Sequence, residues 1–303
     1  MSQLLPVLLL LSAHRVAAAD RIAVDEGLAF RNISRSIEYI EDKDRTLTID
    51  DVRNNAALKW TPVRTASINF GFTRSQYWLR FTVENRAKKE MRWLIEVDYP
   101  SLDLVELHVP DGRGGYKAKR TGDSRPFSSR DVDFHTYLFR ISQEAGTAAY
   151  YLRIDSLDSL NMNVNILSEG HLMERYNHDM PFFWLFFGLM LTMAVSNLFI
   201  FIPTRDGEHV CLALAVLTFA LFEFNFRGFA SQYLWPDASW WTDRANPFLV
   251  SLTCLWVDLF LLEFAGVRRL SPKLYRFSLA TTSGPALVLA LLSLVADLQV
   301  III

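Results

Sequence analysis

Residues 181–202, PFFWLFFGLMLTMAVSNLFIFI, form an apolar stretch without a single ionisable side chain. As an α-helix rising 1.5 Å per residue, this stretch spans roughly 30 Å, the thickness of the hydrocarbon core of a bilayer. Before it, hydrophobic residues come in short alternating runs between polar turns, and after it they come in further long blocks. The sequence therefore predicts a water-facing domain followed by a membrane region over residues 181–303.

Residues 1–19 have features of a signal peptide. The apolar run near the start is too short to cross a bilayer, and Ala17, Ala18 and Ala19 before Asp20 fit a small-residue cleavage site. The basic residue usual at the start of such a signal is missing, so an uncleaved anchor is the alternative. In both cases we expect the domain that follows to lie in the periplasm, and the chain to be a multi-pass protein of the bacterial inner membrane.

Charge and cysteine content exclude several classes of protein. The chain has 31 Lys and Arg against 33 Asp and Glu, so it offers no strongly basic field for nucleic acid. Its two cysteines, Cys211 and Cys254, both fall inside apolar blocks. The first domain therefore has to fold without disulfides, which a domain of roughly 150 residues can do.

Residues 20–168 have the pattern of an antiparallel β-domain. Residues 77–84 alternate between apolar and polar side chains, and residues 93–99 repeat the pattern with Trp93 and Tyr99 on the apolar face. Further runs cover residues 103–109, 135–141, 149–155 and 161–167, with weaker ones at 46–52 and 66–72. Alternation with frequent turns is typical of a sandwich or barrel. We predict an all-β domain, a β-sandwich, with Trp93 and Tyr99 in its core.

Catalysis finds little support in these residues. The histidines are scattered without the spacing of a metal site, and neither a GxSxG nucleophile nor a cysteine occurs before residue 181. We therefore expect no catalytic residue, no metal, no cofactor and no enzyme activity in this chain.

Ligand binding is the better hypothesis, and five residues are its candidates. Trp78 is out of phase with the inward-facing Leu79 and shares the face of Arg80, which predicts an exposed or groove-facing Trp beside a cation. The alternative is that Trp78 packs under a loop. The segment GDSRPFSSRDVD offers further polar groups, and its alternative role is a capping turn tied down by an internal ion pair. The predicted ligand-binding residues are Trp78, Arg80, Asp123, Arg125 and Arg130.

The membrane region is predicted to hold about four helices. The spans are 181–202, 210–229, 246–265 and 278–295. Short basic loops remain in the cytoplasm and Trp gathers at the membrane interface, which places the loops 203–209 and 266–277 inside and the Trp-rich loop between the second and third spans outside. Residues 169–180 connect the sandwich to the first span, and their composition predicts a continuous helix that could transmit motion. Because the chain stops in an apolar run at 297–303, we expect more helices to follow.

A few ionisable residues lie within or near the spans. Glu223 and Arg227 are four residues apart and can pair on one helical face near the outer end of the second span. Asp258 lies deeper, in the middle of the third block, and Glu263 lies nearer the inner end of that block. Since a charge in lipid is costly, one interpretation is a polar switch or relay inside the bundle. The alternative is helix-to-helix hydrogen bonding by a protonated Asp258, because the four helices offer no basic partner at similar depth.

Short patterns in the β-domain add a family resemblance. They are Trp78-Leu79-Arg80-Phe81, Trp93 to Val97 leading into Tyr99-Pro100-Ser101-Leu102-Asp103, Val105-Glu106-Leu107, Thr121-Gly122-Asp123, Pro126-Phe127-Ser128 with Arg130, and Tyr151-Leu152-Arg153 with Ser156 and Ser159-Leu160. In this order the chain resembles the 7TMR-DISM family, bacterial seven-transmembrane receptors with diverse intracellular signalling modules, in its type 2 extracellular domain and first four helices. The resemblance implies a jelly-roll sandwich similar to carbohydrate-binding modules, and a cytoplasmic kinase or cyclase output that this chain lacks.

Two functions are compatible with these observations. In the first, the chain is the sensory half of a receptor, whose partners are a small-molecule or glycan ligand, the lipid bilayer and a cytoplasmic signalling module, with a homodimer left open. The alternative is a membrane transporter or membrane enzyme with an exported accessory domain that uses Asp258, Glu263 and Glu223. Against the alternative, the spans lack the broken half-helices typical of mid-membrane substrate sites.

Overall fold

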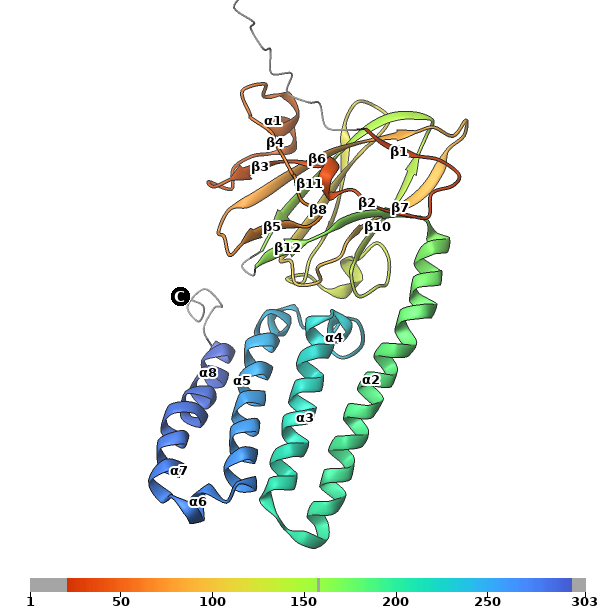
Figure 1. Cartoon of the computed structure of the whole chain (residues 1–303). Helices are drawn as coiled ribbons and strands as arrows, with labels where there is room; N and C mark the ends of the chain where they lie inside the picture. The colour runs from red at the N-terminus through yellow and green to blue at the C-terminus, as the bar shows by residue number, and fades with distance from the viewer. Residues whose placement is uncertain (1–20, 157–158, 296–303) are drawn as a thin grey trace, which may run out of the picture.

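The structure, a computed structural model, describes residues 21–156 and 159–295, so the expected signal peptide at 1–19 and the apolar run at 297–303 lie outside the described residues. Figure 1 shows a β-sandwich at the top and a row of long helices below it. One helix, α2 (Glu169–Thr204), extends from the sandwich to the far end of the row. We call the helices from Pro181 onward the membrane part.

Two main sheets build the sandwich. Its strands are β1 (Ile22–Val24), β2 (Phe30–Asn32), β3 (Glu38–Asp42), β4 (Thr61–Pro62), β5 (Ile68–Gly71), β6 (Gln76–Asn85), β7 (Met91–Val97), β8 (Leu104–Pro110), β9 (Tyr116–Thr121), β10 (Tyr137–Gln143), β11 (Gly146–Asp155), β12 (Leu160–Met162) and β13 (Val164–Leu167). The larger sheet has the order β4-β3-β6-β11-β8-β9, with β1 parallel to β6, and the smaller has the order β10-β7-β13-β2. A two-stranded sheet joins β5 and β12.

The core lies between the two main sheets, as the alternation predicted. On β6, Leu79 and Phe81 point inward and are fully buried. They meet inward-facing residues of the other strands, such as Trp93 of β7 and Tyr150 of β11, whose rings form an edge-to-face contact with centroids 5.6 Å apart. Tyr99 is half-buried against the same cluster. Removing these large side chains from water is the main favourable term in the folding of the sandwich.

One predicted strand is a helix instead. The weak alternating run at 46–52 contains the start of α1 (Ile49–Asn54). Thr48 and Asp51 form a capping box, in which the amide of Asp51 donates to Thr48 Oγ1 at 3.3 Å and the amide of Thr48 donates to Asp51 Oδ2 at 2.8 Å. Since these bonds satisfy amides at the helix start, the local capping signal outweighs a weak alternation. Val52 of α1 then packs on the outer face of the larger sheet.

The connector and the first span form one continuous helix, as predicted. With 36 residues, α2 is about 54 Å long at a rise of 1.5 Å per residue. Ser168 caps its start by accepting a hydrogen bond from the amide of His171 at 3.1 Å. Pro181 lies inside the helix without ending it. The polar first turns, which contact the sandwich, are therefore joined to the membrane part without a flexible linker.

The remaining helices follow the predicted spans with shifted ends. They are α3 (Gly207–Phe226), α4 (Phe229–Tyr233), α5 (Ser239–Phe264), α6 (Val267–Leu270), α7 (Pro272–Ser278), the π-helical turn η3 (Leu279–Ser283) and α8 (Gly284–Val295), with short 3-10 turns η1 (Ser34–Ser36) and η2 (Phe127–Ser129) in the sandwich. Among the described residues, α2, α3, α5 and the segment Pro272–Val295 are long and apolar enough to cross a membrane. The third span starts at Ser239 and not at residue 246, so the helix includes residues 239–245 ahead of the apolar block.

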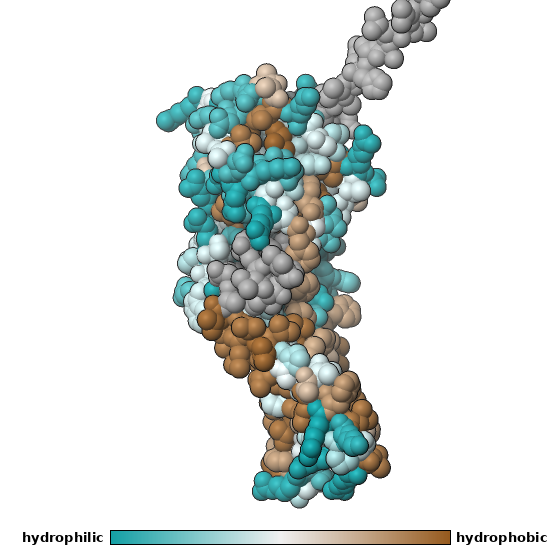
Figure 2. Space-filling model, turned by 90° about the vertical axis from the view of Figure 1, so that its left-hand side faces the viewer, coloured by the Kyte–Doolittle hydropathy of each residue, from teal (hydrophilic) through white to brown (hydrophobic). Residues whose placement is uncertain are grey.

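One end of the membrane part lies next to the sandwich, and the other end is far from it. Figure 2 shows apolar side chains over the helices, between the polar sandwich and a polar far end. The Trp-rich connection between α3 and α5 lies beside the sandwich, whereas the α2–α3 loop and α6 lie together at the opposite end (Figure 1). The sandwich and the Trp-rich connection are thus on one side of the predicted bilayer, in agreement with the loop assignment from the sequence.

Candidate functional site

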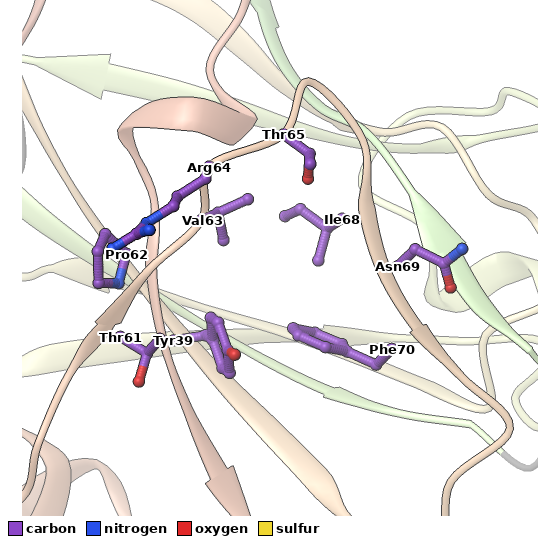
Figure 3. Close-up of a pocket in the computed structure, with 9 residues that line it drawn as sticks. All are labelled: Tyr39, Thr61, Pro62, Val63, Arg64, Thr65, Ile68, Asn69 and Phe70. Carbon is purple, nitrogen blue, oxygen red and sulfur yellow. The ribbon is translucent and has the colours of Figure 1, made fainter.

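A pocket of about 350 Å³ opens where β3, β4 and β5 meet (Figure 3). It is lined by Tyr39, Thr61, Pro62, Val63, Arg64, Thr65, Ile68, Asn69 and Phe70. The short strands β4 and β5 bring together two segments of chain that would otherwise be loops. The pocket therefore belongs to the rim of the sandwich and not to its closed core.

Aromatic rings form one wall of this pocket. The rings of Tyr39 and Phe70 lie side by side in Figure 3, with centroids 4.9 Å apart. Phe70 is held in place by Tyr77 of β6, on which it stacks with a centroid distance of 3.8 Å and an interplanar angle of 5°. Because Tyr77 is itself buried, the aromatic wall is anchored in the sandwich core.

Polar side chains also line the pocket. Thr61, Arg64 and Asn69 are all exposed, and Figure 3 shows the side chain of Arg64 extending towards Pro62. Asn69 Oδ1 accepts a hydrogen bond from the amide of Gly71 at 2.9 Å, which fixes the side chain and leaves its NH₂ group for another partner. Apolar ring faces next to hydrogen-bonding groups suit a small polar ligand with an apolar side, such as a sugar ring.

The predicted site residues on β6 lie elsewhere. Trp78 is only 1% exposed and stacks on His108 with ring centroids 5.3 Å apart, so the expectation of an exposed or groove-facing Trp78 is wrong. The alternative was right that Trp78 is covered, but the cover is the helix α1 with its neighbours and not a loop. Arg80 donates to Glu38 Oε2 at 2.6 Å, and its guanidinium lies 4.2 Å from the ring centroid of Trp60. Both side chains thus have partners on the outer face of the larger sheet.

The three predicted residues between β9 and β10 lie in a loop that faces the membrane part. Asp123 and Arg130 are buried, whereas Arg125 is exposed. Arg130 donates to backbone carbonyls ahead of β10, and its guanidinium lies over two aromatic rings. In the same loop, the amide of Phe127 donates to the carbonyl of Pro236, beyond α4, at 2.8 Å. The five predicted residues are therefore not gathered in one open site, and their role in ligand binding stays a prediction.

An ion pair joins the sandwich to α2. Glu96 of β7 is 1% exposed and accepts two hydrogen bonds from Arg175 of α2, from Nη1 at 2.9 Å and from Nη2 at 2.5 Å. Thr136 Oγ1 at 3.1 Å and Asn165 Nδ2 at 3.0 Å also donate to the same carboxylate. Two parallel N–H···O bonds fix the orientation of the guanidinium as well as its distance. Glu96 and Arg175 therefore determine how the start of α2 is placed on the smaller sheet.

The surroundings of this pair keep it charged. Burial alone would raise the pKa of Glu96, but the hydrogen bonds and charge of Arg175, with Asn165 and Thr136, lower it below its ordinary value. For Arg175, burial acts to lower the pKa, and the hydrogen bonds and charge of Glu96 raise it above the usual value. The two shifts agree in direction, because each residue stabilises the ionised form of the other.

A second contact joins the sandwich to the turn between α3 and α4. The ring of His135 lies beside the backbone of Arg227 and against Phe229, with ring centroids 4.6 Å apart. Gly228 has φ of 79°, and a Cβ at this position would lie 2.3 Å from the carbonyl oxygen of His135. Burial, with the nearby positive charges, lowers the pKa of His135 to about 4. We call this contact and the Glu96–Arg175 pair the junction.

The acidic residues of the membrane part differ in their partners. Glu223 pairs with Arg227 at 3.2 Å, as predicted from their spacing. Glu263 lines a polar hollow at the far end of the bundle. Asp258 is hydrogen-bonded to hydroxyl groups of the following helical segment, which agrees with the predicted helix-to-helix bonding. Within residues 21–156 and 159–295, no three His, Cys, Asp or Glu side chains are grouped so as to hold a metal ion.

Sequence reasoning missed the pocket and the Glu96–Arg175 pair. The pocket is formed by Tyr39 and Phe70, whose strands are too short for a clear alternating pattern. For the pair, a usable signal existed: Glu96 is the one charged residue within the apolar run Trp93 to Val97. A carboxylate in such a strand needs a partner if it is buried, and the connector contains Arg175.

Two family models match the chain in succession. The model described as 7TMR-DISM extracellular 2 matches residues 34–168, and the model described as 7TM diverse intracellular signalling matches residues 179–303. No curated protein matches the chain in sequence. The first matched segment covers the sandwich from η1 onward, and the second begins just before the membrane part.

Solved structures show only distant likeness. A Bacteroides fragilis protein assigned as a beta-galactosidase has a TM-score of 0.28 and 10% identity, over 45% of this chain and 23% of its own. TmCBM61 in complex with beta-1,4-galactotriose has a TM-score of 0.23 and 9% identity, over 48% of this chain and 90% of its own. TM-scores this low carry no argument about ligand or mechanism.

The family matches and the four membrane-capable helices agree with each other. They describe a multi-pass membrane protein made of a receptor-type sensory domain and a transmembrane module. On this evidence the chain belongs to the 7TMR-DISM family, the seven-transmembrane receptors with diverse intracellular signalling modules.

Proposed function

We propose that this chain is the sensory and relay part of a receptor that binds a carbohydrate in the periplasm and passes the signal to a cytoplasmic output module. In this proposal the sandwich binds the ligand, the junction converts binding into a change of its position on the helices, and the helices carry that change across the inner membrane. The output module and a second copy of the chain are partners in the proposal.

The proposed ligand site is the pocket at β3, β4 and β5. Tyr39 and Phe70 supply ring faces against which a sugar can pack, and Arg64 and Asn69 supply donors for its hydroxyl or carboxylate oxygens. Arg64 is exposed and takes part in no ion pair between described residues, unlike Arg80, which is paired with Glu38. Free donors beside an aromatic wall support this pocket more strongly than the residues predicted from strand phase.

The observation that carries the proposal is the direct mechanical link between sandwich and membrane part. Arg175 holds α2 on the buried Glu96, and the same helix continues without a break to Thr204. The turn at Gly228 contacts the sandwich separately, so α2 and α3 are attached to it at different points. A small rotation of the sandwich therefore has to move one helix relative to the other.

Binding changes such an arrangement only under one condition. The ligand must bind more tightly to one of two positions of the sandwich on the helices, since equal affinity for both shifts neither population. The pocket includes β4, which is an edge strand, and β5, which belongs to the separate two-stranded sheet. A ligand that bridges these strands can therefore change the position of one relative to the other.

Thermal unfolding of the whole chain in lipid nanodiscs tests the ligand site. The probes are trisaccharides of glucose, galactose, N-acetylglucosamine and galacturonic acid. We expect at least one of them to raise the melting temperature of the unaltered chain and of Phe72→Ala, and to have no such effect on Arg64→Ala or Phe70→Ala. Phe72 is the matched control, because it is 66% exposed and lies next to β5 but outside the pocket.

Two results would contradict the proposed site. One is an equal shift for Phe70→Ala, Arg64→Ala and the unaltered chain, which would move the ligand to another surface. The other is the absence of any shift across the four trisaccharides, which would count against a carbohydrate ligand.

A further inference from the structure

Asp258 lies in the membrane part on α5, opposite the segment that joins α7 to α8. Its Oδ1 is 3.1 Å from the hydroxyl oxygen of Ser278, and its Oδ2 is 2.6 Å from that of Thr282. The hydroxyl of Ser283 is also hydrogen-bonded to Oδ2. Three hydroxyl groups from one short segment thus converge on one carboxyl group.

The π turn η3 makes this convergence possible. In an α-helix with 3.6 residues per turn, Ser278 and Ser283 would point about 140° apart. Here the amide of Gly284 donates to the carbonyl of Leu279, five residues earlier, so the turn is wider and Ser283 comes round to the side of Thr282. A Cβ on Gly284 would lie 3.0 Å from the Leu279 carbonyl oxygen, which shows how closely the glycine fits this turn.

One hydroxyl in this cluster has more acceptors within reach than it has hydrogens. The single hydroxyl hydrogen of Thr282 has two acceptors within reach, Asp258 Oδ2 at 2.6 Å and the carbonyl oxygen of Ser278 at 2.7 Å. If Asp258 were ionised, the one hydrogen of Thr282 would have to be shared between these two acceptors. A proton on Oδ2 removes the conflict, since Asp258 then donates to Thr282 and Thr282 donates to Ser278.

None of the described residues supplies a cation that pairs with Asp258. The ion pairs of the described residues do not include Asp258. The elements around it carry further titratable side chains, which are Glu208, His209, Cys211 and Glu223 on α3, Arg244, Cys254 and Glu263 on α5, Arg268 and Arg269 on α6, and Lys273, Tyr275 and Arg276 on α7. His209 is bonded to Asn197 and lies 4.0 Å from Glu208. An unpaired carboxylate in the hydrocarbon region is costly, which also favours a neutral acid.

We propose that Asp258, Ser278, Thr282 and Ser283 form a proton-binding site inside the membrane part, in which protonated Asp258 fastens α5 to the turn before α8. Loss of the proton leaves two acceptors facing the same hydroxyl and weakens the contact between these helices. Proton occupancy at Asp258 is therefore a second input to the helices, separate from the ligand pocket.

Infrared spectroscopy of the whole chain in nanodiscs at neutral pH tests the proposal. The difference between the unaltered chain and Asp258→Asn is expected to contain the carbonyl band of a protonated carboxylic acid, which shifts in D₂O. Thr282→Val and Gly284→Ala should move this band to higher frequency, because they weaken or displace its hydrogen-bond partner. Glu263→Gln is the control, an acidic residue of the same helix that should leave the band unchanged.

Two outcomes would overturn the proposal. A difference spectrum without a protonated-acid band would show an ionised Asp258, and a band that disappears when sodium replaces potassium would show a sodium site. If Asp258→Asn does not fold, the unaltered chain labelled with ¹³C-carboxyl aspartate answers the same question. Its acid band must then appear at neutral pH at the isotope-shifted frequency, and its absence contradicts the proposal.

Discussion

Glu96 and Asp258 are two carboxylates that each hold helices in place, and their neighbours differ. Glu96, in the sandwich, accepts two hydrogen bonds from the cation Arg175 and two from neutral side chains. Asp258, in the membrane part, is surrounded by hydroxyl groups without a cation among the described residues. Near water a charged pair can be completed by a long Arg side chain, whereas within lipid a neutral acid avoids the cost of two charges. The contact that holds the helices is thus an ion pair in the water-facing sandwich and, in our proposal, a hydrogen bond from a protonated acid in the membrane part.

Removing the cation from Glu96 is expected to have the largest effect. Arg175→Met leaves a buried carboxylate unpaired, a change that typically costs about 3–5 kcal/mol. We expect the sandwich to detach from α2 before the helices unfold, which limited proteolysis at residues 169–180 and thermal unfolding in nanodiscs would both report.

Two further variants test whether the stability lost in Arg175→Met comes from the unpaired charge of Glu96. Arg140→Gln removes the exposed pair with Glu169, whose charged atoms are 3.8 Å apart, together with a hydrogen bond from the guanidinium to the carbonyl of Asp131, and should still cost only about 1 kcal/mol. The double change Glu96→Leu with Arg175→Leu removes both charges and should recover much of the stability lost in Arg175→Met. Equal losses for Arg175→Met and Arg140→Gln would contradict the role given to Glu96.

Acidification is expected to weaken the junction through both of its titratable groups. The pKa of His135 is lowered to about 4, against roughly 6.5 in an unfolded chain. The unfolded state therefore binds a proton first, so stability falls as the pH decreases from about 6.5 to 4, by up to about 3 kcal/mol. Glu96, whose pKa is lowered, adds a further loss below its unfolded value near 4.3.

Unfolding measured across this pH range checks whether stability falls on acidification and whether His135 is the residue responsible. His135→Gln keeps a hydrogen-bond donor but cannot titrate, so its stability should change little between pH 6.5 and about 4.5 while the unaltered chain loses stability. A parallel decline in both proteins would assign the pH dependence to other groups.

Gly228→Ala is expected to have an intermediate effect. The new Cβ would lie 2.3 Å from the carbonyl oxygen of His135, and the backbone has φ of 79°. Both the clash and the unfavourable conformation destabilise, by about 2 kcal/mol together. Gly170→Ala is the control, because its nearest neighbour would be 4.0 Å away inside α2, and it should be neutral or stabilise by about 0.5–1 kcal/mol. Similar melting temperatures for the two variants would mean that the turn is not pressed against the sandwich.

The fold could be predicted from the sequence wherever a single pattern of apolar residues dominates, either alternation along a strand or a long apolar block. Alternation identified β6 and β7 because each buries one face against the opposite sheet, and the apolar blocks identified the spans. It misassigned residues 46–52, where the capping pair Thr48 and Asp51 decides the structure locally. Trp78 was misplaced for a related reason: α1 covers the second face of β6, so alternation no longer separates buried from exposed.

The sites were harder to predict than the fold. Tyr39 and Phe70 come from strands of different sheets, and only the tertiary fold places their rings 4.9 Å apart. Arg125 and Arg130 looked equivalent as loop cations, yet one is exposed and the other buried over aromatic rings. Glu96 and Arg175 are far apart in sequence. The sequence shows a charged residue in an apolar strand at Glu96, but only the tertiary fold identifies Arg175 as its partner.

The smallest effect is expected at the hydroxyl groups around Asp258. Thr282→Val keeps the shape of the side chain and removes one interhelical hydrogen bond, which within membranes costs about 0.6 kcal/mol on average and rarely more than about 1.7. Thr281→Val is the matched control, because the hydroxyl of Thr281 bonds only to the Phe277 carbonyl of its own helical segment, at 2.8 Å. Unfolding in mixed detergent and SDS micelles should therefore show a small loss for Thr282→Val alone. If both variants lose the same stability, the hydroxyl of Thr282 does not help to hold Asp258 against the segment before α8. The contrast drawn between Asp258 and Glu96 would then be wrong.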